Sequence, residues 1–192
     1  GALASSSASS KEGLSRAGDG SVASLSSFAV WRLVSGHSVP PVRRGAALVL
    51  DEGRQRLVLF GGSSTSGGCG RADSVYCSDT WEWDGRRWHE RLPATSPPPR
   101  HWHAMAYDPT RRRVVLFGGW GPNNHYFGDT WEWDGHDWLE REPALSPQGR
   151  INHAMAYDAA NEAVLLSGGV AALSGKCGVA GSTTCGDQWL WD

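Results

Sequence analysis

Three arginines stand at matching places along the chain, where their guanidinium groups could receive an anion. Arg43, Arg100 and Arg150 are spaced 57 and 50 residues apart, and each precedes a short apolar run. A ring of guanidinium groups around one opening would bind a carboxylate through charge-assisted hydrogen bonds. A second interpretation stays open, in which each arginine donates hydrogen bonds to loop carbonyls of its own repeat.

The stretch "WGPNNHYFGD" at 120–129 combines stacking surfaces with amides. Its candidate binding residues are Trp120, Asn123, Asn124, His125 and Tyr126. Aromatic rings with a few convergent polar groups are typical of sites for sugars or peptides. We therefore expect ligand contacts here.

Two histidines in "HWH" have a spacing that a metal ion could use. His101 and His103 would share one strand face, but no carboxylate lies near them in the sequence. His103 also matches His153 fifty residues later, which favours a structural role in a repeat. No Ser-His-Asp set or carboxylate pair stands out. The sequence therefore predicts no catalytic residue, no metal and no cofactor, although enzyme activity stays open.

Four cysteines form two pairs with equal spacing. Cys69 and Cys77 are eight residues apart, as are Cys177 and Cys185, and the middle repeat has a shorter loop without cysteine. A disulfide across each longer loop explains this coincidence. A metal site is disfavoured because the spacing is unlike that of zinc knuckles. Two disulfides predict an oxidising, extracellular or cell-surface location.

These residues are positioned by a repeat of about 50 residues. "DTWEWDG" occurs at 79–85 and 129–135, and "DQWLWD" at 187–192 is a divergent copy. A fixed period of this size indicates a repeat architecture. Each unit predicts four antiparallel strands joined by turns, with three units at about 44–91, 101–141 and 151–192. The paired tryptophans of the third strand lie two residues apart and so share one face of each sheet, where we expect them to pack between sheets.

Composition sets the limits of these interpretations. The net charge of −2 gives no basis for binding nucleic acid, and no apolar run approaches the length of a membrane helix. Residues 1–27 are rich in serine and lack aromatic residues, which is typical of a disordered tail or linker. Residues 28–192 carry the repeats.

The four-stranded unit with a Gly-Gly pair and repeated tryptophans resembles the kelch repeat of β-propellers. The motifs are Gly61-Gly62, Gly118-Gly119 and Gly168-Gly169, together with Trp88 and Trp138. The resemblance covers 28–192 and implies an all-β propeller made of three four-stranded blades. It also implies binding of proteins or carbohydrates, because most such propellers are binding modules and only a minority are enzymes.

Three blades are too few to close a ring. A lone strand at 28–35, containing Trp31, would complete the last blade, either in its own chain or in a partner. The chain is then half of a six-blade ring that a homodimer completes, or a fragment of a larger propeller. The function predicted is that of an extracellular module presenting loops on one face to a protein or carbohydrate ligand. The alternatives are a secreted carbohydrate-active enzyme, or its propeller domain, and a structural oligomerisation scaffold.

Overall fold

A computed structural model of the chain describes residues 31, 33, 39–65, 69, 75–172, 177 and 183–192. The chain divides into two units, Gly1–Ser35 and Gly36–Asp192, and all the described strands belong to the second unit. The tail predicted at 1–27 lies outside the described residues.

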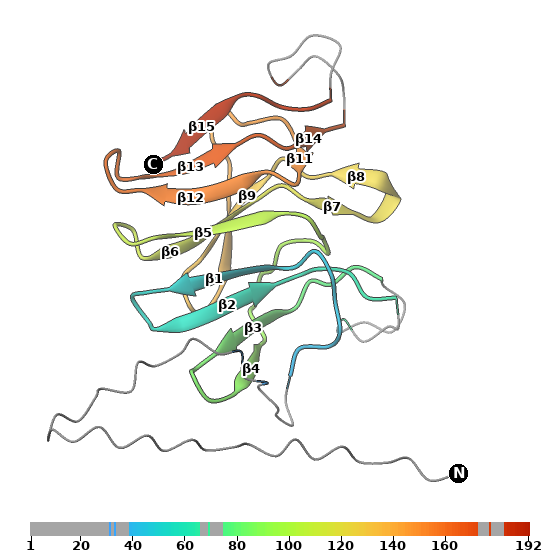
Figure 1. The fold of residues 1–192 in the computed structure, drawn as a ribbon, viewed down its shortest axis with the longest axis vertical. Coiled ribbons are helices and arrows are strands. Elements are labelled where there is room, and N and C mark those ends of the chain that lie inside the picture. The colour runs from blue at the N-terminus through green and yellow to red at the C-terminus, as the bar shows by residue number, and fades with distance from the viewer. Residues whose placement is uncertain are drawn as a thin grey trace, which may run out of the picture. The chain divides into compact units, whose positions relative to one another are not determined.

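The second unit is built from three antiparallel sheets that follow one another along the chain (Figure 1). Within each sheet the strands pair in chain order, as the repeat predicts. The first sheet holds β1 (Ala47–Asp51), β2 (Arg56–Phe60), β3 (Thr80–Trp83) and β4 (Trp88–Arg91). The second holds β5 (Ala104–Asp108), β6 (Arg113–Phe117), β9 (Thr130–Trp133) and β10 (Trp138–Arg141). The third holds β12 (Ala154–Asp158), β13 (Ala163–Ser167) and β15 (Gln188–Trp191). The all-β, blade-like fold class is therefore confirmed.

Turn chemistry fixes the register of the first two strands in each sheet. The carboxylate of Asp51 accepts the backbone N–H of Arg54, and Asp108 accepts that of Arg111 in the same way. The residue that follows each of these arginines, Gln55 or Arg112, takes a positive φ that closes the tight turn. The strands then pair residue for residue, so the repeated sequence produces a repeated register.

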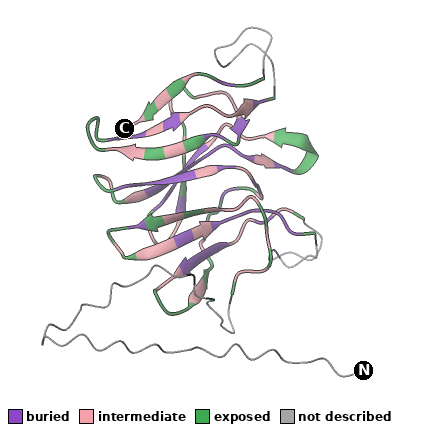
Figure 2. Ribbon diagram, viewed as in Figure 1, coloured by how far each residue is buried: buried purple, intermediate pink, exposed green. Residues whose placement is uncertain are grey.

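The core lies between the sheets, and the second sheet is buried on both faces (Figure 2). Trp131 and Trp133 pack against the first sheet as expected, together with Trp138 of β10. In the first sheet, the face of β3 that carries Thr80 and Glu82 is buried as well, because both residues are 0% exposed. A buried carboxylate needs partners, and those partners are described below because they join one sheet to the next.

Two short strand pairs extend the middle and last repeats beyond the sheets. They are β7 (Trp120–Gly121) with β8 (His125–Tyr126), and β11 (Arg150–Ile151) with β14 (Val170–Ala171). A single 3-10 turn, η1 (Pro122–Asn124), links β7 to β8. No helix among the described residues is long and apolar enough to cross a membrane.

The strand expected at 28–35 falls mostly outside the described residues. Trp31 and Leu33 are described, lie outside strands and are fully exposed. Within the described ranges the third sheet has three strands, so a fourth one remains a prediction.

Candidate functional site

The three repeated arginines are bound within their own repeats. Arg100 donates two hydrogen bonds to the Asp129 carboxylate, of 2.6 and 2.7 Å, and its Nη1 also donates to the Gly118 carbonyl at 3.1 Å. Arg150 holds Asp187 and the Gly168 carbonyl in the same way. Arg43 does so with Asp79 and Gly61. In each repeat the aspartate also accepts the indole N–H of the first tryptophan of the third strand.

This geometry supports the structural interpretation that the sequence left open. The Arg100 and Arg150 side chains are 0% exposed, so neither guanidinium can reach a ligand at the surface. Burial raises the pKa of Asp129, but the hydrogen bonds and charge of Arg100 outweigh it and leave the pKa below its ordinary value. The arginines therefore join the start of the first strand to the third strand within each sheet.

Both predicted disulfides are present, Cys69–Cys77 and Cys177–Cys185. All four cysteines are buried. Each bridge closes a long loop at the end of the sheets where the second strand leads into the third, and the described residues contain no free cysteine.

The predicted stretch at 120–129 forms a projecting hairpin at this same end of the sheets. Trp120 and Tyr126 are paired across β7 and β8, and their rings stack with centroids 6.0 Å apart. Asn123, Asn124 and His125 form the exposed tip. Both asparagines adopt positive φ, which this residue type tolerates well.

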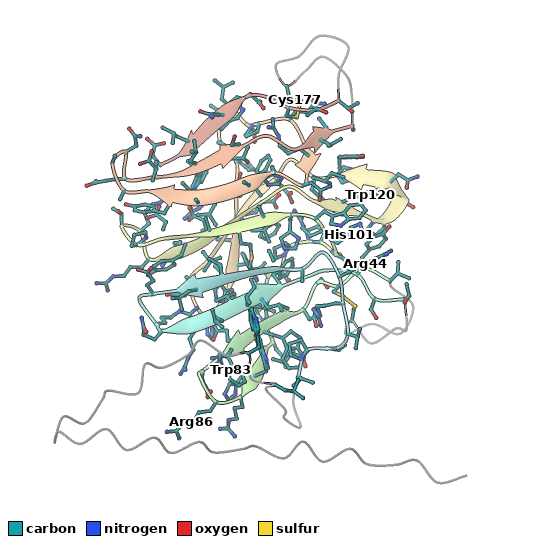
Figure 3. All side chains as sticks on the ribbon, viewed as in Figure 1. Arg44, Trp83, Arg86, His101, Trp120 and Cys177 are labelled. Carbon is teal, nitrogen blue, oxygen red and sulfur yellow. A yellow bond between two sulfur atoms is a disulfide. The ribbon has the colours of Figure 1, made fainter. Side chains whose placement is uncertain are left out.

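Aromatic rings from another segment extend the hairpin into a continuous surface. His101 pairs with Trp120 through two backbone hydrogen bonds of 2.8 and 2.9 Å. The His101 ring stacks on Trp102 with centroids 3.9 Å apart, and Trp102 lies 5.5 Å from Trp120. We call His101, Trp102, Trp120 and Tyr126 the aromatic platform. Figure 3 shows His101 and Trp120 close together at one end of the sheets, with Arg44 beside them.

Trp102 occupies a backbone position that does not suit it. Its φ is 58°, and the matching residues in the other repeats are Gly45 and Asn152, with φ of 64° and 54°. Glycine and asparagine tolerate this left-handed conformation, whereas a bulky side chain there costs roughly 1–2 kcal/mol. The middle repeat alone places an indole at this strained position, in contact with His101 and Trp120 of the platform. Strained residues cluster at ligand-binding sites, so this position is a candidate for a binding role.

Polar groups border the platform without partners that would occupy them. Nε1 of Trp120 and Nε2 of His101 are buried and have no hydrogen-bond partner among the described residues. Nδ1 of His101 lies 3.2 Å from the Ser63 hydroxyl. Burial, together with the nearby charge of Arg44, lowers the pKa of His101 and favours the neutral ring at pH 7. Arg44 is exposed and makes no ion pair with any described residue.

The two histidines of "HWH" do not act together. His101 belongs to the platform, whereas His103 is buried against Phe60 at a centroid distance of 5.6 Å. His153 packs in the same way against Phe117, and burial beside Arg150 lowers its pKa to about 4. In the described part of the chain no group of three histidine, cysteine or acidic side chains is placed to hold a metal ion.

Sequence reasoning found the hairpin and missed the rest of the platform. Trp102 and Arg44 carried no motif of their own, and His101 drew attention only as half of a possible metal pair. A signal was available in the alignment of the repeats, where Gly45, Trp102 and Asn152 share one position. A tryptophan at a position where the other repeats carry glycine and asparagine, which tolerate positive φ, is an anomaly that the alignment alone can reveal.

Comparison with known proteins supports the fold. No family model matches the chain, and no curated protein matches it. Among solved structures, one titled "Structure of YjhT" aligns with a TM-score of 0.56 and 19% sequence identity. The alignment covers 77% of this chain and 42% of that one, so the chain spans less than half the length of this structural neighbour. A likeness at this identity shows a shared fold.

Proposed function

We propose that this protein is a binding module of the kelch-type propeller class, which recognises carbohydrate through the aromatic platform. The observation that carries the proposal is the strained Trp102, whose indole stacks on His101 and lies beside Trp120. The other two repeats avoid this cost at the matching position, where they carry glycine and asparagine. A ligand-binding surface accounts for it.

Carbohydrate fits the platform better than a peptide does. The half-buried rings of Trp102, Trp120 and Tyr126 offer apolar faces for the C–H side of a pyranose, and the buried His101 ring supports Trp102 by stacking on it. Arg44 and the asparagines at the hairpin tip add donors and acceptors at the edge. Arg44 further favours a sugar that bears a carboxylate or another anionic group.

The test is glycan-array binding of the whole chain and its variants. Trp102→Asn copies the third repeat, and the strain it relieves offsets the indole contacts with His101 and Trp120 that it removes. We therefore expect folding stability to change by less than about 1 kcal/mol while glycan binding falls at least tenfold. His125→Ala at the hairpin tip should weaken binding, whereas His136→Ala, an exposed histidine at the opposite end of the second sheet, should not. Absence of binding to any glycan, with capture of a protein ligand that Trp102→Asn abolishes, would assign the platform to protein recognition instead.

The two disulfides support an extracellular or cell-surface location for this module. Cytosolic reductants would oppose both bridges. Intact disulfides in protein recovered from the native compartment would agree with this assignment, and free thiols there would contradict it.

We further propose that residues 28–35 supply the fourth strand of a third sheet. In the second sheet Trp138 packs edge-on against Phe60 and donates its indole N–H to Thr80 at 2.9 Å. The matching residues of the next repeat, Phe117 and Thr130, line a hollow between the second and third sheets that no described tryptophan fills. Trp31 precedes Trp88 by the 57 residues that separate other repeat equivalents, and it is the matching indole.

Chain direction favours the third sheet of a second copy as the place of this strand. In the structure each fourth strand leads into the first strand of the next sheet, as β4 leads into β5. A strand at 28–35 leads into β1, so its sheet would lie next to the first sheet, on the side away from the second. Two copies would then complete a six-sheet ring. Trp31→Ala should lower the melting temperature by several degrees if the indole fills the hollow, and an unchanged melting temperature would contradict it.

A further inference from the structure

Adjacent sheets are joined by one recurring set of polar contacts, which we call the interlock. At the contact between the first and second sheets, Glu82 accepts the indole N–H of Trp133 at 3.1 Å and a guanidinium N–H of Arg54 at 2.6 Å. Close by, the Tyr107 hydroxyl accepts the backbone N–H of Gly53 at 3.0 Å. The glutamate and arginine come from the earlier sheet, and the tryptophan and tyrosine from the later one.

The contact between the second and third sheets repeats the interlock. Glu132 accepts the indole N–H of Trp191 at 2.9 Å, and Arg111 lies 3.4 Å from it. The Tyr157 hydroxyl is 2.6 Å from the hydroxyl of Thr110. Each sheet therefore has a leading face, with glutamate and arginine, and a receiving face, with tryptophan and tyrosine.

The two outer faces of the stack break this pattern in a matched way. On the leading face of the third sheet, Leu190 stands where the glutamate belongs and Asn161 where the arginine belongs. On the receiving face of the first sheet, Leu50 stands where the tyrosine belongs. The outer leading face therefore lacks the glutamate and arginine of the interlock, and the outer receiving face lacks its tyrosine.

Both outer faces expose apolar surface in the single chain. Leu48, Leu50 and Leu190 are 54%, 42% and 50% exposed. Trp83 and Trp88 already lie together at a centroid distance of 5.7 Å, close to the 5.4 Å of their buried counterparts Trp133 and Trp138. Figure 3 shows Trp83 on the first sheet. Contact with water favours polar and charged groups, whereas leucine stands at the glutamate position of the third sheet and at the tyrosine position of the first.

We propose that the leading face of the third sheet binds the receiving face of the first sheet of a second copy, through an apolar contact that replaces the interlock. This inference rests on the paired assembly proposed above and specifies its surfaces. The two inner contacts show that leading and receiving faces stack on one another. Gln188, at the position of Thr80, keeps an acceptor for Trp88, as Thr80 does for Trp138.

The matched losses explain why only outer faces would pair with each other. An outer leading face placed on an inner receiving face would offer no arginine loop beside the tyrosine hydroxyl, whereas the outer receiving face has Leu50 at that position and no hydroxyl that needs a partner. Buried polar groups left without partners oppose such contacts. Two equal contacts related by a twofold axis close the assembly at two copies.

Sedimentation velocity of the whole chain tests the proposal. We expect a mass of about 41 kDa, twice the 20.7 kDa of one chain. Leu190→Glu places a carboxylate without an arginine partner in the contact, because Asn161 stands where the inner contacts have arginine, and it should raise the dissociation constant at least about 100-fold, giving single chains. Asn161→Arg combined with Leu190→Glu rebuilds the interlock of the inner contacts and should restore the pair. Leu92→Glu, at an 89% exposed leucine of a connecting loop, is the matched control and should leave the mass unchanged.

Three results would overturn the proposal: single chains for the unmodified protein, larger open assemblies, or a Leu190→Glu variant that stays paired. The same variants test glycan binding independently of pairing. The aromatic platform lies at one end of the sheets, so single chains of Leu190→Glu should retain glycan binding. If the unmodified protein binds glycan as single chains, the platform proposal stands and the pairing proposal fails. If it pairs but binds no glycan, the pairing proposal stands and the carbohydrate proposal fails.

Discussion

Replacing Arg100 by methionine should cost far more stability than replacing any exposed arginine. The guanidinium makes four hydrogen bonds, two to Asp129 and one each to the carbonyls of Pro98 and Gly118. Methionine fills a similar volume but leaves the Asp129 carboxylate, whose side chain is 19% exposed, with Trp131 as its remaining side-chain donor. Breaking a buried ion pair from one side costs about 3–5 kcal/mol.

That loss is a large fraction of the roughly 5–15 kcal/mol that stabilises a typical domain. For a unit of this size it corresponds to a fall in melting temperature of about 6–20 °C, measurable by circular dichroism. Asp129→Asn added to Arg100→Met removes the unpaired charge and should recover part of the loss, about 1–2 kcal/mol. Arg44→Met is the control, because an exposed and unpaired arginine should contribute less than about 0.5 kcal/mol.

The same pair of variants separates a structural arginine from a ligand-binding one. Arg44→Met should keep its melting temperature and bind an anionic glycan less tightly. Arg100→Met should unfold earlier and bind normally at temperatures where it is folded. An Arg100→Met protein of unchanged stability that no longer binds ligand would refute the structural role and restore the arginine ring.

Three further outcomes follow from the packing. His153 should contribute a loss of about 2 kcal/mol of stability between pH 7 and pH 5 in urea unfolding, because its folded-state pKa is about 4 while the unfolded ring takes up a proton near 6.5. Burial also lowers the pKa of His103, which adds to the slope, so His153→Gln should reduce the fall by about 2 kcal/mol, and an unchanged slope would contradict this. Cys177→Ser with Cys185→Ser should cost about 2–3 kcal/mol by chemical unfolding, whereas equal stability with and without the bridge would show that the loop contributes nothing. Glu82→Gln should lower the free energy of unfolding by about 3 kcal/mol, the lower end of the loss expected for the Arg100 variant. The loss is smaller because the Arg54 and Arg91 side chains are 31% and 42% exposed and can turn to water. A loss under about 1 kcal/mol would show that the interlock does not stabilise the fold.

Local patterns predicted the sheets well because each repeat carries its own turn and strand signals. Asp51 and Asp108 cap matching turns, and Trp131 and Trp133 share a face as period-two alternation requires. The cysteine pairs could also be predicted from the sequence, because each disulfide joins residues only eight positions apart.

Contacts between repeats were beyond such reasoning. Glu82 and Trp133 lie 51 residues apart, and nothing local to either one indicates that a buried carboxylate of one sheet receives the indole of the next. The aromatic platform was hidden for the same reason, because His101 and Trp102 meet the hairpin only after the sheets have stacked. The arginines were correctly seen as repeated, but their partners had to come from the structure.

Saturation-transfer NMR with a glycan selected on the array tests the carbohydrate platform most directly. Irradiation of aromatic protons should transfer saturation to the ring C–H protons of the sugar in the unmodified protein, because they lie on the indole faces of Trp102 and Trp120. The transfer should disappear in Trp102→Asn while the melting temperature is kept. Saturation transfer that persists at full strength in Trp102→Asn would contradict the account and place the ligand elsewhere on the molecule.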